Sequence, residues 1–252
     1  MNIEAQLKDL IGPIPEGISE GVALGTGLAD GYDVYESPIG DVAVTFNPTG
    51  VTSVDLSEPG FEDRFRSRFE RPLIRAEAPR AWERHIRPAI EAGRPGKLPV
   101  DLSSVTRFQG EVLMATATIP RGEVRPYAWI ASQAHHPKAI RAAGSSVASN
   151  PIPLIIPCHR VVRSDGHVGK YSLGGPENKW ELLEHEGVNP NRLERLAAQH
   201  IRVFADPSNG EFCYPTCHAI QDIPVDALVP YATIAGAEAD GYRPCNDCQP
   251  CC

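Results

Sequence analysis

The sequence lacks any long apolar run. Its longest apolar cluster, residues 151–157, is too short to cross a membrane and is interrupted by prolines. The first residues, Met1 to Glu4, do not form a basic stretch followed by an apolar one, so no secretory signal is expected. These absences predict a cytoplasmic protein without a membrane partner, and we expect it to act as a monomer.

Positive charge is also scarce, because the chain of 252 residues has a formal net charge of −8. Phosphate binding normally requires Lys and Arg, so this balance argues against a nucleic-acid partner. The distribution of charge favours the opposite conclusion. Residues 121–170 hold seven basic and two acidic residues, a local charge of +5, and form a candidate contact for an anionic ligand. A solvated surface that binds nothing explains the charge equally well.

Cysteine is nearly absent from the first 212 residues, where Cys158 stands alone. The other six cysteines all follow residue 212. A secreted disulfide framework would normally spread its cysteines through a small domain. A reduced compartment and one metal site fit this distribution better.

Two short apolar segments predict a β-hairpin near the N-terminus. Apolar and polar residues alternate over residues 40–46, and residues 51–56 are extended again after the turn sequence at 47–50. Residues 61–93 are rich in Arg and Glu and predict helical stretches interrupted by three prolines (Pro72, Pro79, Pro88). Residues 1–30 predict only a short helix and a glycine-rich lead-in.

Further along the chain the pattern predicts a helix-turn-helix. Pro126 suits the first position of a helix over 126–134, and a second helix follows over 137–147. Small residues line the second helix and allow close approach of a partner, or equally of another packed helix (Ala139, Ala142, Ala143, Gly144, Ser145, Ser146). A last helix is expected within 174–187, and residues 188–200 predict a linker or transitional helix.

Cys158 is followed directly by His159, a pair with the potential for nucleophilic chemistry. A thiol is a strong nucleophile only as thiolate, and its ordinary pKa is about 8.5, so it needs a base or a positive charge nearby. Neighbours in sequence rarely hydrogen-bond directly, so His159 would act through a water, with Glu186 as the group that orients it. On residue types alone, a small cysteine of the core is the commoner case.

The context of this pair resembles a known active site. Residues 150–162, with the sequence NPIPLIIPCHRVV, are similar to the active-site signature of the O6-alkylguanine-DNA alkyltransferases. The resemblance runs from about Ser37 to Gly187. It includes Phe108-Gln109 before a helix and four further short segments (122–124 with Tyr127, 137–142, 169–172, 185–187).

The resemblance implies an α+β fold class with two domains before the tail. Residues 1–100 are expected to form an RNase H-like sheet domain, and residues 101–190 a helical domain with the helix-turn-helix. It also implies the activity: Cys158 takes the alkyl group from O6-alkylguanine in double-stranded DNA, once and irreversibly, without a cofactor.

The resemblance further implies a role for each site residue. His159 is the water-mediated base, Glu186 orients it, and the Asn150 side chain braces the active-site turn. The target nucleotide must be flipped out of the duplex, at a cost of a few kcal/mol. Tyr127 presses on the 3′ phosphate and Arg141 fills the vacated space. The remaining candidates contact DNA or line the guanine pocket (Ala142, Gly144, Val161, Tyr171, Ser172).

The tail, residues 198–252, contains two close pairs of cysteines separated by 27 residues (Cys213 and Cys217, Cys245 and Cys248). Four thiolates at this spacing suit a tetrahedral zinc site, whereas disulfides within such close pairs would be strained. The sequence therefore predicts that the tail binds one zinc ion.

The tail also resembles the zinc domain of the Ada DNA-repair proteins, through Phe212, the four cysteines and three short segments (231–232, 241–244, 249–250). This resemblance implies that Cys213 accepts methyl from methyl phosphotriesters in DNA. Residues 201–252 carry a charge of −5, which opposes contact with a phosphate backbone. A structural zinc module or a protein-binding module therefore stays open. Cys251 and Cys252 are either spare ligands or reactive thiols.

Two other functions compete with repair. One is a lesion-recognition protein that flips alkylguanine without transfer and recruits partners through the zinc domain. The other is a thiol enzyme that acts on proteins or peptides. Cys158 itself disfavours the first, and the basic helix with Arg141 disfavours the second. No AraC-type DNA-binding region accompanies the tail, so no role in transcription is expected.

Overall fold

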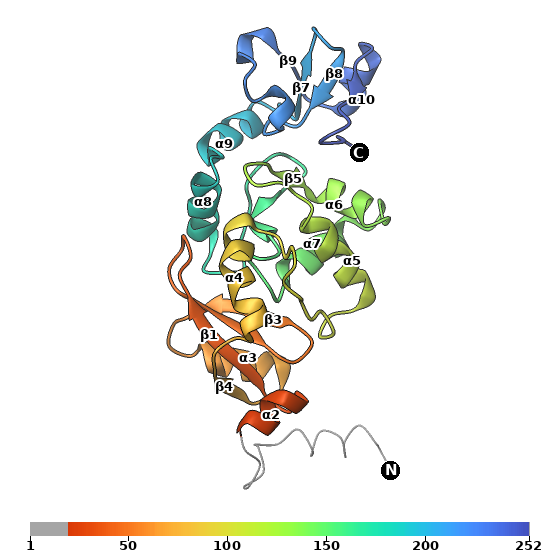
Figure 1. Cartoon of the computed structure of the whole chain (residues 1–252). Coiled ribbons are helices and arrows are strands. Elements are labelled where there is room, and N and C mark those ends of the chain that lie inside the picture. The colour runs from red at the N-terminus through yellow and green to blue at the C-terminus, as the bar shows by residue number, and fades with distance from the viewer. Residues whose placement is uncertain (1–19, 252) are drawn as a thin grey trace. The chain divides into compact units, whose positions relative to one another are not determined.

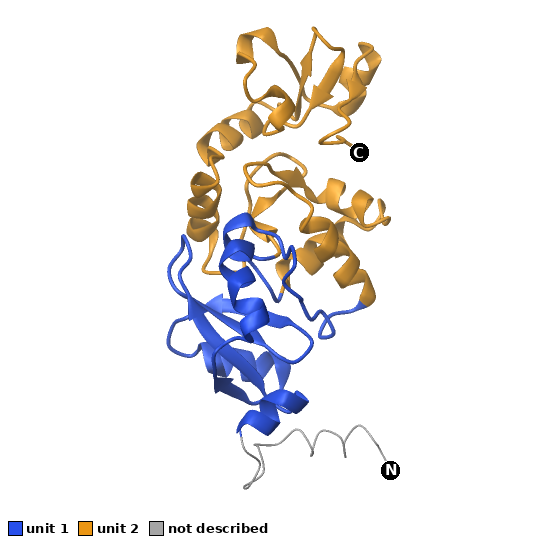
Figure 2. Ribbon diagram, viewed as in Figure 1, with its two compact units in different colours: residues 1–106, 151–155 blue, residues 107–150, 156–252 orange. Residues whose placement is uncertain are grey.

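The computed structural model describes residues 20–251, which form two compact units (Figures 1 and 2). Unit 1 comprises Met1–Thr106 and Pro151–Ile155, and unit 2 comprises Arg107–Asn150 and Ile156–Cys252. The expectation for residues 1–30 lies partly outside the described residues. The division into three domains, 1–100, 101–190 and 198–252, stays a prediction.

Unit 1 is built on a four-stranded sheet with the order β3-β2-β1-β4. After helix α2 (Glu20–Thr26), the strands are β1 (Asp30–Tyr35), β2 (Val42–Phe46), β3 (Val51–Leu56) and β4 (Leu73–Arg75). Strands β2 and β3 pair antiparallel, which confirms the predicted hairpin, and β4 joins β1 in parallel. All five residues of β2 are buried, so this strand lies in the core.

The hairpin turn depends on Asn47 and Gly50. The Asn47 side chain accepts the backbone N–H groups of Thr49 (2.8 Å) and Gly50 (3.2 Å), and donates to Asp101 at 2.6 Å. A Cβ atom at Gly50 would lie 2.7 Å from the backbone of Pro99. Only glycine allows this close approach of the two chain segments.

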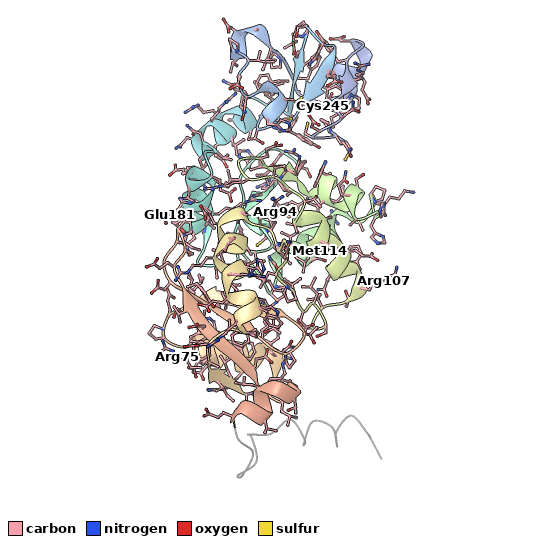
Figure 3. The ribbon with its side chains drawn as sticks, viewed as in Figure 1. Arg75, Arg94, Arg107, Met114, Glu181 and Cys245 are labelled. Carbon is pink, nitrogen blue, oxygen red and sulfur yellow. The ribbon has the colours of Figure 1, made fainter. Side chains whose placement is uncertain are left out.

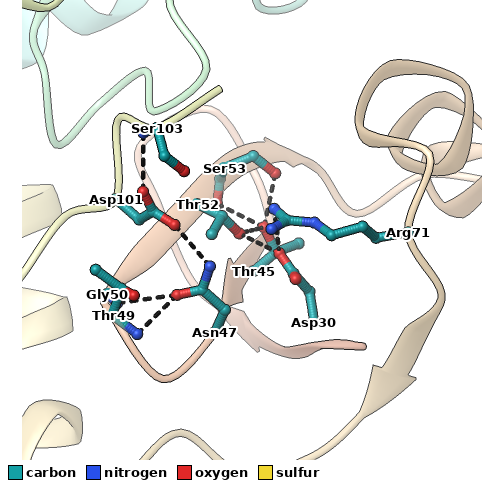
Figure 4. A network of polar contacts seen from close by, with 10 residues as sticks. All are labelled: Asp30, Thr45, Asn47, Thr49, Gly50, Thr52, Ser53, Arg71, Asp101 and Ser103. Atoms are coloured by element: carbon teal, nitrogen blue, oxygen red, sulfur yellow. Dashed lines mark hydrogen bonds and ion pairs between the residues drawn. The ribbon is translucent and has the colours of Figure 1, made fainter. Parts of the chain in front are cut away.

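A buried polar network joins the strands of unit 1 (Figure 4). The fully buried carboxylate of Asp30 accepts hydrogen bonds from Thr52 (2.8 Å) and Arg71 (3.1 Å). The Thr45 hydroxyl in turn bonds with the hydroxyls of Thr52 (2.7 Å) and Ser53 (2.8 Å). Burial raises the pKa of Asp30, partly offset by the bond from Thr52 and the charge of Arg71. Polar groups inside a sheet are stabilising only when they find partners, so this network fixes the strand pairing.

Residues 61–93 form helices α3 (Phe61–Phe69) and α4 (Arg80–Ala92), with β4 between them. The expectation that Pro88 interrupts a helix was wrong, because Pro88 lies inside α4. Proline removes one helical hydrogen bond, at a cost of about 3 kcal/mol. The buried face of α4, with Ile86, Ala89 and Ile90, offsets this cost.

Unit 2 begins with α5 (Arg107–Thr116), α6 (Tyr127–Gln133) and α7 (Ile140–Ala148), which pack against one another. Phe108 and Gln109, expected before a helix, lie in the first turn of α5. The predicted second helix begins three residues late, because Pro137 to Ala139 form a turn in which the Ala139 N–H bonds to the His136 carbonyl. The turn between α6 and α7 contains His135 with a positive φ of 62°.

The rest of unit 2 contains the nucleophile turn and the tail. The turn Cys158–Arg160 leads into β6 (Val161–Val162), which pairs in parallel with β5 (Arg125–Pro126). Helices α8 (Pro176–His185) and α9 (Pro190–Ala198) follow, so residues 188–200 are mainly helical. The tail contains a sheet of order β10-β8-β7-β9 and one helix (β7 Val203–Asp206, β8 Glu211–Cys213, β9 Val229–Tyr231, α10 Ile234–Ala239, β10 Arg243–Pro244).

Among residues 20–251, every helix is too short or too polar to span a lipid bilayer.

Candidate functional site

The candidate nucleophile Cys158 begins a single tight turn between Pro157 and β6, and the residue is only 4% exposed. The Asn150 amide holds this turn from the other side. It donates to the Ile156 carbonyl at 2.8 Å and to the Cys158 Sγ at 3.2 Å. Asn150 therefore links the end of α7 to the nucleophile turn, as a bracing residue would.

Burial raises the pKa of the Cys158 thiol, and the Asn150 bond, the Lys179 charge and Tyr171 lower it by less. The thiol is therefore mostly protonated at neutral pH, and thiolate chemistry requires a base within reach.

His159 is positioned for this task by Glu186. The His159 Nε2 lies 2.9 Å from Glu186 Oε1, and both side chains are almost fully buried. Burial lowers the pKa of His159 more than the Glu186 contact raises it, so the imidazole is neutral at pH 7. A neutral ring that donates from Nε2 to a carboxylate keeps a lone pair on Nδ1. The buried Nδ1 has no hydrogen-bond partner among the described residues, so it can accept a proton, directly or through a water.

Glu186 is in turn held by Arg160, the third residue of the turn. The Arg160 guanidinium donates from Nε to Oε2 (2.8 Å) and from the terminal nitrogen to Oε1 (2.7 Å), and also reaches the Ile119 carbonyl (2.7 Å). Burial alone would raise the pKa of Glu186, but the bonds from His159 and Arg160 lower it to about 2. The carboxylate therefore stays ionised and fixes the tautomer of His159 at all ordinary pH values.

Lys179 is a member of this site that the sequence analysis missed. It lies on α8, is 1% exposed, and donates to the carbonyls of Val161 (2.7 Å) and Val168 (2.6 Å). Burial lowers its pKa to about 8, although Cys158 acts in the opposite sense. The spacing of Lys179 with the buried Leu182 and Leu183 is the helical pattern that placed it on the inward face.

Three other predicted residues lie close to the nucleophile. The Tyr171 ring packs edge-on against His159, with ring centroids 6.2 Å apart. Tyr127 begins α6, and burial and then the nearby Cys158 raise its pKa. Val161 is fully buried and supplies the carbonyl that Lys179 binds. The structure therefore brings together seven of the predicted residues (Tyr127, Asn150, Cys158, His159, Val161, Tyr171, Glu186).

The remaining predicted residues lie at the surface of the same unit. Arg141 and Ala142 are exposed near the start of α7, and Ser172 is exposed in the loop before α8. Gly144 is half-buried, and a Cβ atom there would contact the Tyr127 ring at 3.8 Å. Ala143 and Ser146 of α7 are buried, so part of its small-residue surface serves helix packing, and close approach to a partner stays a prediction.

The basic segment 121–170 is less exposed than its composition indicated. Arg125 and Arg160 are buried in ion pairs with Glu123 and Glu186, so neither contributes charge to the surface. Five basic side chains of the segment are exposed (Arg121, Lys138, Arg141, Arg163, Lys170). The basic residues counted in the sequence therefore exceed those that are exposed at the surface of this segment.

The four predicted ligands in the tail form one buried cluster (Cys213, Cys217, Cys245, Cys248). Cys245, which Figure 3 labels, directly follows strand β10. The four Sγ atoms lie within 4.8 Å of one another, and four thiolates around zinc at about 2.3 Å stand about 3.8 Å apart. No disulfide joins any cysteines within residues 20–251. These residues fit a tetrahedral zinc ion, which would hold the two halves of the small tail together.

Of the two remaining cysteines, Cys251 lies outside this cluster and is partly exposed. Its backbone N–H donates to the Tyr214 hydroxyl at 3.2 Å. Cys252 lies outside the described residues.

Two family models match this chain. The DNA binding domain of 6-O-methylguanine DNA methyltransferase matches residues 107–188, and the metal binding domain of Ada matches residues 196–251. The first contains Cys158 and its neighbours, and the second contains the cysteine cluster. The zinc assignment for the tail is thereby confirmed.

Curated and solved proteins agree with these models. A methylated-DNA–protein-cysteine methyltransferase of Methanosarcina barkeri is 37% identical over 147 residues, which are 57% of this chain and 89% of that protein. The bifunctional transcriptional activator and DNA repair enzyme Ada of Escherichia coli is 33% identical over 175 residues, 67% of this chain and 48% of that protein. The Mycobacterium tuberculosis OGT structure in complex with DNA has 32% identity and a TM-score of 0.51, and the match covers 65% of this chain and 98% of that one.

We expect one zinc ion per chain in the purified protein, because the four cysteine sulfurs already lie within 4.8 Å of one another. A Cys248→Ser variant should lose most of this zinc. The matched control, Cys251→Ser, should keep it. Metal analysis by mass spectrometry checks both. An equal loss of zinc in the two variants would refute the assignment.

The chain covers 32% of the length of the rat relative and about half of E. coli Ada. It covers 89% of the M. barkeri methyltransferase at 37% identity, and the family model for the DNA binding domain matches the residues around Cys158. The chain belongs to the methylated-DNA–protein-cysteine methyltransferase family, and its tail is an Ada-type metal-binding domain.

Proposed function

We propose that this protein repairs DNA by moving the alkyl group of O6-alkylguanine onto Cys158. The observation that carries the proposal is the buried chain of contacts from Arg160 through Glu186 and His159 to the Cys158 turn. This series of contacts holds a base in place, which is needed when a thiol must lose its proton in a buried site that contains little water. A protein that only recognised the lesion would have no use for it.

The chemistry is a displacement at the alkyl carbon. His159 Nδ1 takes the thiol proton, and the Cys158 sulfur forms a bond to the alkyl carbon while the carbon–O6 bond breaks. The electron pair of that bond passes to the guanine, which takes up one proton from water while His159 returns the thiol proton to water. In the balance, the thiol exchanges its hydrogen for the alkyl group, and the thioether product is stable. Each protein molecule therefore acts once.

DNA approaches through α6 and α7, which we propose to be a helix-turn-helix. Tyr127 begins α6 and lies near Cys158, while Arg141 is exposed on α7. Extrusion of a nucleotide costs a few kcal/mol, and an inserted Arg141 offsets part of it by filling the gap in the stack. Tyr127 presses on the 3′ phosphate. Tyr171, Ser172 and Val161 line the pocket that receives the guanine, and Ala142 and Gly144 let the helix approach the duplex.

For the sheet of unit 1 we propose an RNase H-like fold. Its order β3-β2-β1-β4, with two antiparallel pairs followed by a parallel β1–β4 pair, supports this assignment. The helix α3 forms the crossover that a parallel connection requires.

For the tail we propose a structural zinc site rather than a second alkyl acceptor. Cys213 is 2% exposed, and residues 201–252 carry a charge of −5. Cys213 begins a segment that we call the zinc loop, residues 213–218. This loop is hydrogen-bonded to other parts of unit 2. Acceptance of methyl by Cys213 from phosphotriester DNA is the alternative. It would require a mass gain on Cys213 while zinc is bound.

The first prediction of this proposal concerns Cys158. Wild-type protein incubated with a duplex containing O6-methylguanine should gain one methyl per chain and then stop. Cys158→Ala should gain none yet bind the same duplex with similar affinity, because the DNA-contacting helices are unchanged. Intact-protein mass spectrometry and a gel-shift titration measure the two. Undiminished methyl gain by Cys158→Ala would overturn the proposal, and binding without any methyl gain by the wild type would favour lesion recognition.

A second prediction separates base flipping from chemistry. Arg141→Ala should slow transfer from duplex DNA at least about tenfold more than reaction with free O6-benzylguanine, since the free base needs no extrusion. Arg87→Ala, an exposed arginine of unit 1, is the control and should change neither rate. Equal slowing of both reactions by Arg141→Ala would contradict the assigned role.

A third prediction follows from the pKa of His159. Transfer should be constant above about pH 6.5, the ordinary pKa of histidine, and fall in acid as the imidazole takes up a proton. Glu186→Gln should slow transfer about tenfold or more. It should also move the acid fall to lower pH, because the Glu186 charge raises the pKa of His159.

Single-turnover rates between about pH 5 and 8 test this prediction. The matched control is Glu184→Gln, an exposed change on the same helix. A slow Glu186→Gln variant whose acid fall does not move would show that Glu186 acts only in folding.

A further inference from the structure

The zinc loop contacts the family-matched segment 107–188 on both sides of one zinc ligand. The Thr216 hydroxyl accepts the Val124 N–H at 2.9 Å, and His218 Nδ1 lies 2.8 Å from Glu123 Oε1. Cys217 lies between the two loop residues. Its sulfur, a ring nitrogen of His218 and a Glu123 oxygen are all within 4.8 Å of one another. A zinc ligand is thus held directly against the segment that carries the nucleophile.

Arg125 forms a second, buried connection at the same place. Its guanidinium is 2% exposed, pairs with Glu123, and lies 5.6 Å from the centroids of two aromatic rings. One ring is Trp129 of α6 and the other is Tyr214 of the zinc loop. A desolvated guanidinium between two aromatic faces is attracted to both. Arg125 therefore ties the loop to α6 as well as to Glu123.

Apolar packing at this contact is incomplete. A cavity of about 290 Å³ lies beside it, lined by Val124, Pro126 and Val162 on one side and by Tyr214 and Ile234 of the tail on the other. Side chains around a void lose part of their van der Waals contact. The polar contacts of Thr216 and His218 therefore add to the contact between Arg125 and Tyr214 in holding the zinc loop in place.

The residues that contact the zinc loop are close in the fold to the turn that contains Cys158. Glu123 and Val124 lead directly into β5, whose two residues pair with Val161 and Val162 of β6. Strand β6 begins directly after the turn that contains Cys158. The zinc loop is therefore connected to the turn that contains Cys158 through β5 and β6.

We propose that the zinc loop is an intramolecular docking element whose partner is the surface formed by Glu123, Val124 and Arg125. Zinc fixes Cys213 and Cys217, and so orders the two side chains that bond to this surface. Because metal binding and docking each favour the same loop conformation, each stabilises the other. The proposal does not depend on whether Cys158 accepts an alkyl group.

The test uses the full chain and two independent measurements. Amide hydrogen exchange at Val124, followed by NMR, should be at least about tenfold faster after zinc is removed by a chelator, because its acceptor Thr216 is then released. The variant Thr216→Val/His218→Ala should show the faster exchange with zinc present. Its zinc Kd, measured by chelator competition, should rise about tenfold, since two polar contacts no longer support the bound state.

Glu238→Ala, an exposed change on α10, is the control and should alter neither quantity. The reciprocal variant Glu123→Gln, on the other side of the contact, should also raise the zinc Kd although it leaves every residue of the tail intact. Exchange at Val124 that is unaffected by zinc would overturn the proposal. A zinc Kd unchanged in both the loop variant and Glu123→Gln would overturn it as well.

Discussion

The site depends on one buried carboxylate, that of Glu186. An ionised carboxylate in the interior is costly unless every oxygen finds a partner. Arg160 and His159 supply those partners, and both belong to the same three-residue turn as Cys158. The carboxylate at the end of α8 therefore fixes the turn, the tautomer of the base and the position of the thiol together. In the proposed reaction, the His159 base that Glu186 holds compensates for the burial that raises the pKa of the Cys158 thiol.

A second buried carboxylate in unit 2 also holds separate chain segments together. Glu123 is buried and paired with Arg125, and it also receives His218 from the zinc loop. Both carboxylates are too buried for water to replace their hydrogen-bond partners, so each one fixes the chain segments that supply those partners. Glu186 contacts the two residues that lead into β6, and Glu123 lies two residues before β5: the first carboxylate holds the turn that contains Cys158, and the second holds the zinc loop. The tail is thereby hydrogen-bonded to the segment that leads into β5.

Sequence patterns predicted the features that depend on local residues. The hairpin of unit 1, the cysteine cluster and the Cys158-His159 turn follow from short motifs, and each was found where expected. The charge count failed for Arg125 and Arg160, because composition cannot distinguish a surface arginine from one buried in an ion pair. Lys179 was missed although its helical spacing with Leu182 and Leu183 places it on the buried face of α8, where it donates to backbone carbonyls. Contact of the tail with Glu123 involves residues 95 positions apart, which no local pattern encodes.

The central claim is that one buried thiol, supported by Glu186, receives the alkyl group. Peptide mapping by tandem mass spectrometry tests it directly, on the zinc-loaded full chain after incubation with O6-methylguanine duplex. The account predicts methyl on Cys158 and on none of the other cysteines. Methyl on a zinc-site cysteine instead, or an unmodified Cys158 in protein that has demethylated the DNA, would contradict it.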